Sequence, residues 1–254
     1  GVVALLPVHA AAAVFGLAYG LSAPLISLAL HERGITESVI GANAAMYALG
    51  VLAMAPRLPG SITRWGSWPL LVFGVLVVAL TLPLFWLLPW IGVWFVLRFL
   101  LGVGSETVMV LTETWVSSSS EEARRSTNIA VYTARLSAGF AIGRGILSVL
   151  GTHSWVTYAV GGVLPLIALG VPAAGRARPR AVTESGDSRG LLALAAAAPL
   201  AMAGTALNAA LEAAGLSMLP IYAVQQGWSP ASASLLISTL MLGVWMTAVS
   251  LFSR

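Results

Sequence analysis

The chain has 254 residues, of which 58% are hydrophobic and only 9% are charged, and its mean hydropathy is +0.91. A water-soluble domain of this length needs far more polar surface, so the composition argues against a soluble enzyme. The net charge of +4 comes from 13 basic residues, all arginine. Most of them lie in short links between apolar runs, which indicates membrane orientation and not nucleic-acid binding.

Uncharged apolar runs recur along the chain with the length that crosses a bilayer as a helix, about 20 residues. Six of them predict membrane spans, at residues 10–30, 38–55, 70–88, 155–174, 191–211 and 229–253. Two further runs, at 91–115 and 127–150, are equally long but contain charged residues. We therefore expect an all-α integral membrane protein with eight transmembrane helices.

The arginines are distributed unevenly between the links. Nine of them lie in the even-numbered links or at the end of the chain, whereas Arg33 alone lies in an odd-numbered link. Because cytoplasmic loops hold the excess of basic residues, we expect an inner (plasma) membrane protein whose N-terminus and even-numbered links are cytoplasmic.

A polar stretch at 175–190 follows the sixth predicted span and has the composition of a flexible linker. It divides the chain into a six-helix bundle at 1–174 and the first two helices of a second bundle at 191–254. The segment that begins at Gly34 and the one that begins at Gly227 resemble each other, and both reach Gly-Val sixteen residues later. Such a six-helix repeat is typical of the two halves of major facilitator transporters.

Several motifs carry a resemblance to this superfamily. Gly34-Ile-Thr is similar to the entry of its second helix, and Arg98-x-x-x-Gly102-x-Gly104 to its fourth-helix motif. The fourth to fifth helices resemble a branch of uncharacterised transporters in Glu113-Thr-Trp115, Arg124, Arg125, Tyr132 and Gly139-x-x-x-Gly143. Members run to twelve helices, so the resemblance implies a truncated chain.

The second link departs from the superfamily's loop motif. Arg64 and Gly66 are kept, and the resemblance implies a gating role for Arg64, but Thr63 stands where the family has aspartate. Arg144 likewise stands after the fifth-helix glycine pair, where antiporters carry proline. Drug/proton antiport therefore does not follow from the motifs.

Charged residues within a span are costly, about 2.5–3.5 kcal/mol each on insertion scales, and mark candidate functional sites. Glu106 and Arg135 lie at similar distances from the fourth link, so a helical hairpin predicts an ion pair, either a proton-linked gate or a static bridge. Arg98 and Arg144 also share a predicted depth and either face different sides or frame an anion pocket. The resemblance favours Arg98 for proton coupling.

The remaining candidates are weaker. Glu113 is two turns from Glu106 on one helix face and could pair with Arg124 or Arg125 as a latch. Glu212 is the one charged residue of its span and is a candidate substrate or proton site, since the resemblance places that helix at the central cavity. Four polar residues at membrane depth are cavity candidates that could equally bond between helices: Tyr19, Asn43, Tyr132 and Asn208.

These features predict a secondary transporter of small molecules that works by alternating access, with proton coupling expected and export favoured over uptake. Uptake or exchange of organic anions and a non-transporting membrane scaffold or receptor are the alternatives. No cofactor is expected, because the chain has no cysteine, three histidines and no lysine for a phosphate-binding loop. The expected partners are the substrate, protons and membrane lipid.

Overall fold

The computed structural model describes residues 2–120, 122–174 and 218–229, together with positions 215, 232, 233 and 235. Side chains are described from residue 12 onward, except at 123, 168 and 171–174. Helices and short turns make up the described residues, and no strand occurs among them. The α-helices are α1 (Val2–Glu32), α2 (Glu37–Met54), α3 (Leu58–Trp65), α4 (Ser67–Leu87), α5 (Ile91–Ser119), α6 (Arg125–Leu150) and α7 (Trp155–Ala174).

In chain order, a helix occurs at each of the six predicted spans between residues 10 and 174. The structure adds the short helix α3 in the second link. By length and composition, four of the described segments could cross a membrane: Ala12–Glu32, Glu37–Trp65, Ser67–Leu87 and Ile91–Ser119. Helix α6 is not among them, because its arginines and small polar residues lower its hydropathy. The expected count of eight spans is thus not confirmed, and the predicted spans at 191–211 and 229–253 lie almost entirely outside the described residues.

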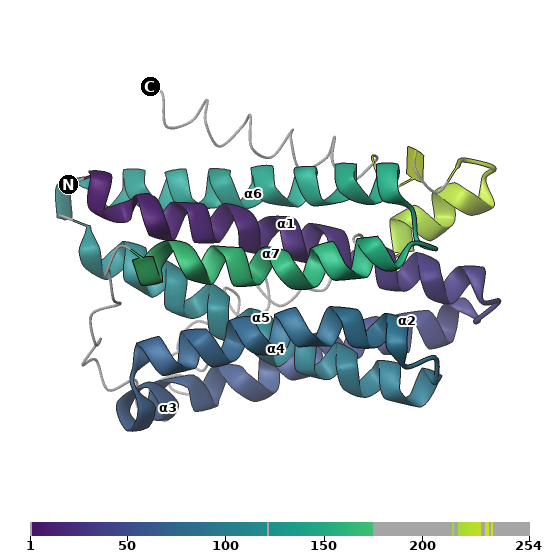
Figure 1. Ribbon diagram of the computed structural model, residues 1–254, viewed down its shortest axis with the longest axis horizontal. Coiled ribbons are helices and arrows are strands. Elements are labelled where there is room, and N and C mark those ends of the chain that lie inside the picture. The colour runs from purple at the N-terminus through teal and green to yellow at the C-terminus, as the bar shows by residue number, and fades with distance from the viewer. Residues whose placement is uncertain are drawn as a thin grey trace, which may run out of the picture.

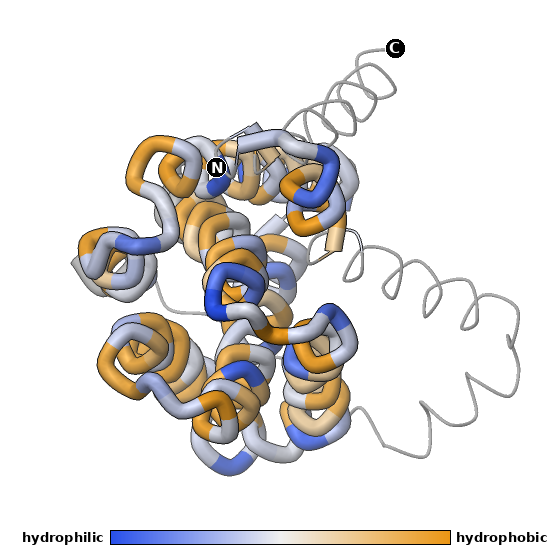
Figure 2. Tube along the Cα trace, turned by 90° about the vertical axis from the view of Figure 1, so that its right-hand side faces the viewer, coloured by the Kyte–Doolittle hydropathy of each residue, from blue (hydrophilic) through white to orange (hydrophobic). Residues whose placement is uncertain are grey.

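The helices run back and forth between two ends of the bundle (Figure 1). We call these the odd end, where the odd-numbered links lie, and the even end, where α3 and the fourth link lie. Figure 2 looks along the helices from the odd end and shows hydrophilic residues chiefly in the connections. Gly151 ends α6 there with φ of 72°, a left-handed conformation that favours glycine, and its N–H donates to the Leu147 carbonyl at 2.8 Å.

Neighbours in space are not always neighbours in sequence. Helix α6 packs most extensively against α1, and α2 against α5, while α4 lies between α5 and α7. Since α1 and α6 both run from the even end to the odd end, they are parallel, and so are α2 and α5 in the opposite direction (Figure 1).

Glycines allow these parallel pairs to touch through their backbones. A Cβ atom at Gly16 or Gly20 of α1 would overlap the Leu136 or Phe140 carbonyl group of α6. Conversely, a Cβ atom at Gly143 of α6 would overlap the Leu17 carbonyl oxygen of α1. Small residues at such contacts are the usual way in which membrane helices approach closely, so these glycines have a packing role.

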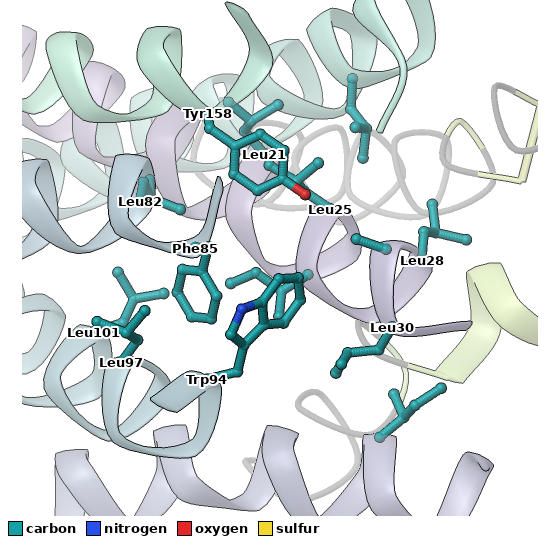
Figure 3. Close-up of a cluster of buried hydrophobic side chains, with 14 of the residues drawn as sticks. Leu21, Leu25, Leu28, Leu30, Leu82, Phe85, Trp94, Leu97, Leu101 and Tyr158 are labelled. Atoms are coloured by element: carbon teal, nitrogen blue, oxygen red, sulfur yellow. The ribbon is translucent and has the colours of Figure 1, made fainter. Parts of the chain in front are cut away.

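Two clusters of buried apolar side chains fill the bundle. The even-end cluster joins α1, α4, α5 and α6 around Trp115 and Leu111. The odd-end cluster, drawn in Figure 3, includes Leu25 and Leu28 of α1, and in it Phe85 meets Trp94 edge to face at 5.0 Å between ring centroids. Ile221, from the far side of the linker, belongs to this odd-end cluster.

Candidate functional site

Arg98 is buried inside the bundle, and it is the centre of the candidate site. Its side chain comes from α5 and the residue is 3% exposed. Neither its Nε nor its Nη1 has a hydrogen-bond partner among the described residues. Its guanidinium carbon lies 5.8 Å from the centroid of the Tyr47 ring, a cation–π contact. The Tyr19 ring packs against Tyr47, at 5.2 Å between ring centroids, so a second tyrosine lies close to this contact.

Asn43 is a second buried polar group on the neighbouring helix α2. It is 2% exposed, and its Nδ2 has no partner among the described residues. Asn43 lies one helical turn before Tyr47, as Arg98 lies one turn before Gly102. Gly102 approaches Tyr47 so closely that a Cβ there would overlap the Tyr47 carbonyl oxygen. Because α2 and α5 are parallel, Asn43 and Arg98 therefore lie at the same level of this helix pair.

Tyr47, whose ring contacts Arg98, belongs to a chain of aromatic rings from three helices. The Tyr19 ring of α1 lies 5.2 Å from the Tyr47 ring and 5.3 Å from the Phe140 ring of α6, both between centroids. Ser105 of α5 lies beside the Tyr47 hydroxyl. Helices α1, α2, α5 and α6 thus each contribute a side chain around Arg98. We call Arg98, Asn43, Tyr19, Tyr47 and Phe140 the central cluster.

Tyr47 and Phe140 are the members of the central cluster that the sequence analysis missed. Tyr47 could have been found, because a tyrosine four residues after Asn43 shares its helix face. Phe140 carried no such signal, since an aromatic residue in an apolar helix is most often a packing residue.

Arg144 is fully buried in α6, with 0% exposure. Its Nη1 donates to the Phe140 carbonyl one turn earlier on the same helix at 3.3 Å. The side chain is therefore held along α6, beside the residue that contributes a ring to the central cluster.

The predicted ion pair between Glu106 and Arg135 is wrong for this structure. No Asp or Glu of the described residues lies within 4.0 Å of an Arg, and the one acid–base contact among them is His153 Nε2 to Glu32 Oε2 at 3.4 Å. The charge that acts on Glu106 is that of Glu113 on its own helix. The hairpin argument failed because α6 packs along α1 and makes a much smaller contact with α5.

Hydroxyl and amide groups join α5 to α6 instead. The Thr112 and Tyr132 hydroxyls are 2.9 Å apart in a buried hydrogen bond, and Asn128 Nδ2 donates to Ser120 Oγ at 2.8 Å. Tyr132 is 2% exposed and so connects two helices near the even end.

The latch candidates lie apart from one another. Glu113 is exposed, as are Arg124 and Arg125, and the expected pairing between them does not form. Arg64 is exposed on α3, where its guanidinium lies 5.7 Å from the centroid of the Trp65 ring. Glu212 and Asn208 lie outside the described residues.

The described residues beyond the linker meet the first bundle at its odd end. Ile221 is 2% exposed within the odd-end cluster, and Met218 and Val224 pack against that cluster. Gln225 Nε2 donates to Glu37 Oε1, at the start of α2, at 2.7 Å. The yellow segment of Figure 1 accordingly lies beside the link between α1 and α2. Apolar and polar contacts thus join residues 218–229 to the first bundle at its odd end.

A separate hollow of about 250 Å³ lies between α4 and α7, remote from the central cluster. Its lining is apolar, as Leu80, Pro83 and Val163 illustrate, and Leu80 is 63% exposed. A pocket that orients a polar ligand needs a few convergent polar groups, and this one offers none.

Comparison with known proteins places the chain in context. The family model described as Major Facilitator Superfamily matches residues 8–254. The chain is also similar to the Uncharacterized MFS-type transporter YfkF of Bacillus subtilis (strain 168), with 30% identity over 155 residues. That match covers 61% of this chain and 40% of the relative, so it spans less than half of the relative's length.

Proposed function

Because the chain belongs to the Major Facilitator Superfamily, we propose that it works as a proton-coupled secondary transporter of small molecules, with export favoured over uptake. The observation that carries the proposal is the burial of Arg98, at 3% exposure, among polar and aromatic side chains of four helices. A charge placed inside a membrane bundle is costly and is retained where it lies on a substrate or ion pathway.

Glu106 is the proton-binding candidate on α5. It is half-buried, it lies two turns from Arg98 on the same helix, and no Arg of the described residues lies within 4.0 Å of it. An acid without a counterion changes its interactions strongly when it gains a proton. Arg135 and Arg144 of α6 and the undescribed Glu212 are the further candidates for substrate or proton binding, and Arg64, Glu113, Arg124 and Arg125 for gating at the even end.

The contacts at the odd end support alternating access. Packing of Ile221 and the hydrogen bond from Gln225 to Glu37 close this end. With the even-numbered links in the cytoplasm, as the arginine distribution favours, this state is closed to the outside. Transport then requires these contacts to break while the even end closes, as the two halves rock about a midplane site.

Cross-linking at the odd end tests this proposal without a known substrate. The chain has no cysteine, so a Glu37→Cys, Gln225→Cys double variant introduces the one reactive pair. We expect efficient cross-linking in proteoliposomes at equal pH on both sides, because the two side chains are in hydrogen-bond contact. An imposed pH gradient is expected to lower the yield, since proton binding shifts the balance between the two states.

An Arg64→Cys, Gln225→Cys variant serves as the matched control. Arg64 lies on α3 at the even end (Figure 1), so this pair should remain uncross-linked. A yield at the odd end that does not respond to any pH gradient would contradict proton-coupled alternating access and would favour a membrane scaffold.

A further inference from the structure

We propose that Arg98 and Asn43 form a binding site for the carboxylate group of an aromatic substrate. The inference rests on the proposed transport function and gives it a substrate class. It starts from two buried hydrogen-bond donors, Arg98 and Asn43, which lie at one level on two neighbouring helices. Nitrogen atoms of both side chains have no hydrogen-bond partner among the described residues.

Unsatisfied buried donors indicate a missing acceptor. The great majority of buried polar groups in proteins have a partner, so each exception calls for an explanation. Here two nitrogens of Arg98 and the amide nitrogen of Asn43 are unpaired within the described part of the chain. All three nitrogens are hydrogen-bond donors, and the two of Arg98 belong to a cationic guanidinium group. The ligand that completes such a site is an acceptor with negative charge.

The shape of the guanidinium narrows the class of anion. Its planar set of N–H groups matches the two oxygens of a carboxylate, and Asn43 adds one neutral donor at the same level of the neighbouring helix. A site for a fully charged phosphate would be expected to gather more than one cation. Arg98 is the one cation among the five residues of the central cluster, because the buried Arg144 is held along α6 by its hydrogen bond to the Phe140 carbonyl at 3.3 Å. A single negative charge fits better.

The surrounding rings indicate what the carboxylate is attached to. The ring of Tyr19, on α1, lies 5.2 Å from that of Tyr47 on α2 and 5.3 Å from that of Phe140 on α6, both between centroids. Aromatic walls favour an aromatic or flat apolar body through offset and edge-to-face contacts. The central cluster therefore combines an anion-binding end with an aromatic wall.

Thermal unfolding of the purified protein in detergent tests the site with benzoate as the probe and benzamide as its uncharged analogue. Ligands that bind the folded state raise the unfolding temperature. We expect benzoate to raise it in a concentration-dependent way and benzamide to leave it unchanged. Arg98→Gln is expected to weaken benzoate binding by about 10- to 100-fold, the range of a charge-assisted hydrogen bond, and Asn43→Ala by about 3- to 10-fold.

Two further variants serve as controls for this test. Arg57→Gln removes an exposed arginine at the even end and should leave benzoate binding unchanged. Arg98→Lys keeps the charge without the planar fork, so intermediate binding in a folded protein supports the site even if Arg98→Gln does not fold. Equal stabilisation of wild type and Arg98→Gln, or none of the wild type, would overturn the proposal.

A carboxylate of the chain itself is the competing occupant, and a Glu212→Gln variant separates it from a substrate. If benzoate stabilised only that variant, the site would belong to the protein's own acid and the substrate class would be wrong. Thermal unfolding measures binding and does not depend on translocation. A negative result in this test would therefore rule out the carboxylate site without ruling out transport. Odd-end cross-linking that responds to a pH gradient would still support transport even if benzoate did not bind.

Discussion

Exchanging Gly143 for leucine is expected to prevent α6 from docking on α1 and to abolish stable folding of the bundle. A Cβ atom at this position would already overlap the Leu17 carbonyl oxygen and lie 2.8 Å from the Leu21 backbone nitrogen. These are backbone atoms of a helix, which cannot move aside as a flexible side chain can. Overpacking a tight interface typically costs about 1–3 kcal/mol, and here a whole side chain enters a backbone contact.

Gly145→Leu is the matched control, two residues further along the same helix. A Cβ atom at Gly145 would meet nothing within 4 Å, so the same change should alter stability by no more than about 0.5 kcal/mol, as for surface positions. The measurement is the fraction of folded, monodisperse protein after extraction, with the unfolding temperature for variants that survive. Similar behaviour of the two variants would contradict the close packing of α1 on α6.

Arg98→Met is expected to raise the stability of the ligand-free protein. Methionine has a similar length and lacks the buried donors, each of which costs about 1–3 kcal/mol when it is left without an acceptor. Replacing a poorly compensated buried charge by an apolar residue is often stabilising for this reason. The unfolding temperature should therefore rise by several degrees relative to the wild type. The same variant should lose benzoate binding, an exchange of function for stability.

Arg57→Met provides the comparison at an exposed arginine, and its unfolding temperature should stay close to that of the wild type. A marked loss of stability in Arg98→Met would mean that an acceptor already pairs with the guanidinium in the resting protein. The account of Arg98 as a site open to a ligand would then be wrong.

The positions of the six long helices, α1, α2, α4, α5, α6 and α7, could be predicted from hydropathy, whereas the short α3 could not. The run at 155–174, for example, coincides with α7, Trp155–Ala174. The family resemblance, drawn from motifs such as Arg98-x-x-x-Gly102-x-Gly104, is confirmed by the family match to residues 8–254. Hydropathy and family motifs are both local signals in the sequence. The thickness of the bilayer fixes the length of an apolar run, and a motif is defined by the spacing of a few nearby residues.

Which helices pack together could not be predicted from such signals. The expected pairing of Glu106 with Arg135 assumed that helices joined by a short link face each other, whereas α6 lies along α1. The glycines of α1 and α6 carried the information on this contact, yet a glycine spacing does not name its partner helix. Tyr47 shares a helix face with Asn43 and could have been listed with it, but its contacts with the Tyr19 ring and with Arg98 involve other helices and could not be predicted.

The proposed transport function requires that the polar groups of the bundle line an aqueous path and do not face lipid. Labelling of single cysteines by a membrane-impermeant, charged thiol reagent in proteoliposomes tests this most directly, because the chain has no cysteine of its own. Glu106→Cys, on α5, is predicted to react, whereas Leu80→Cys, at the exposed apolar hollow between α4 and α7, is predicted to stay unlabelled. An unreactive Glu106→Cys beside a labelled Leu80→Cys would contradict the account.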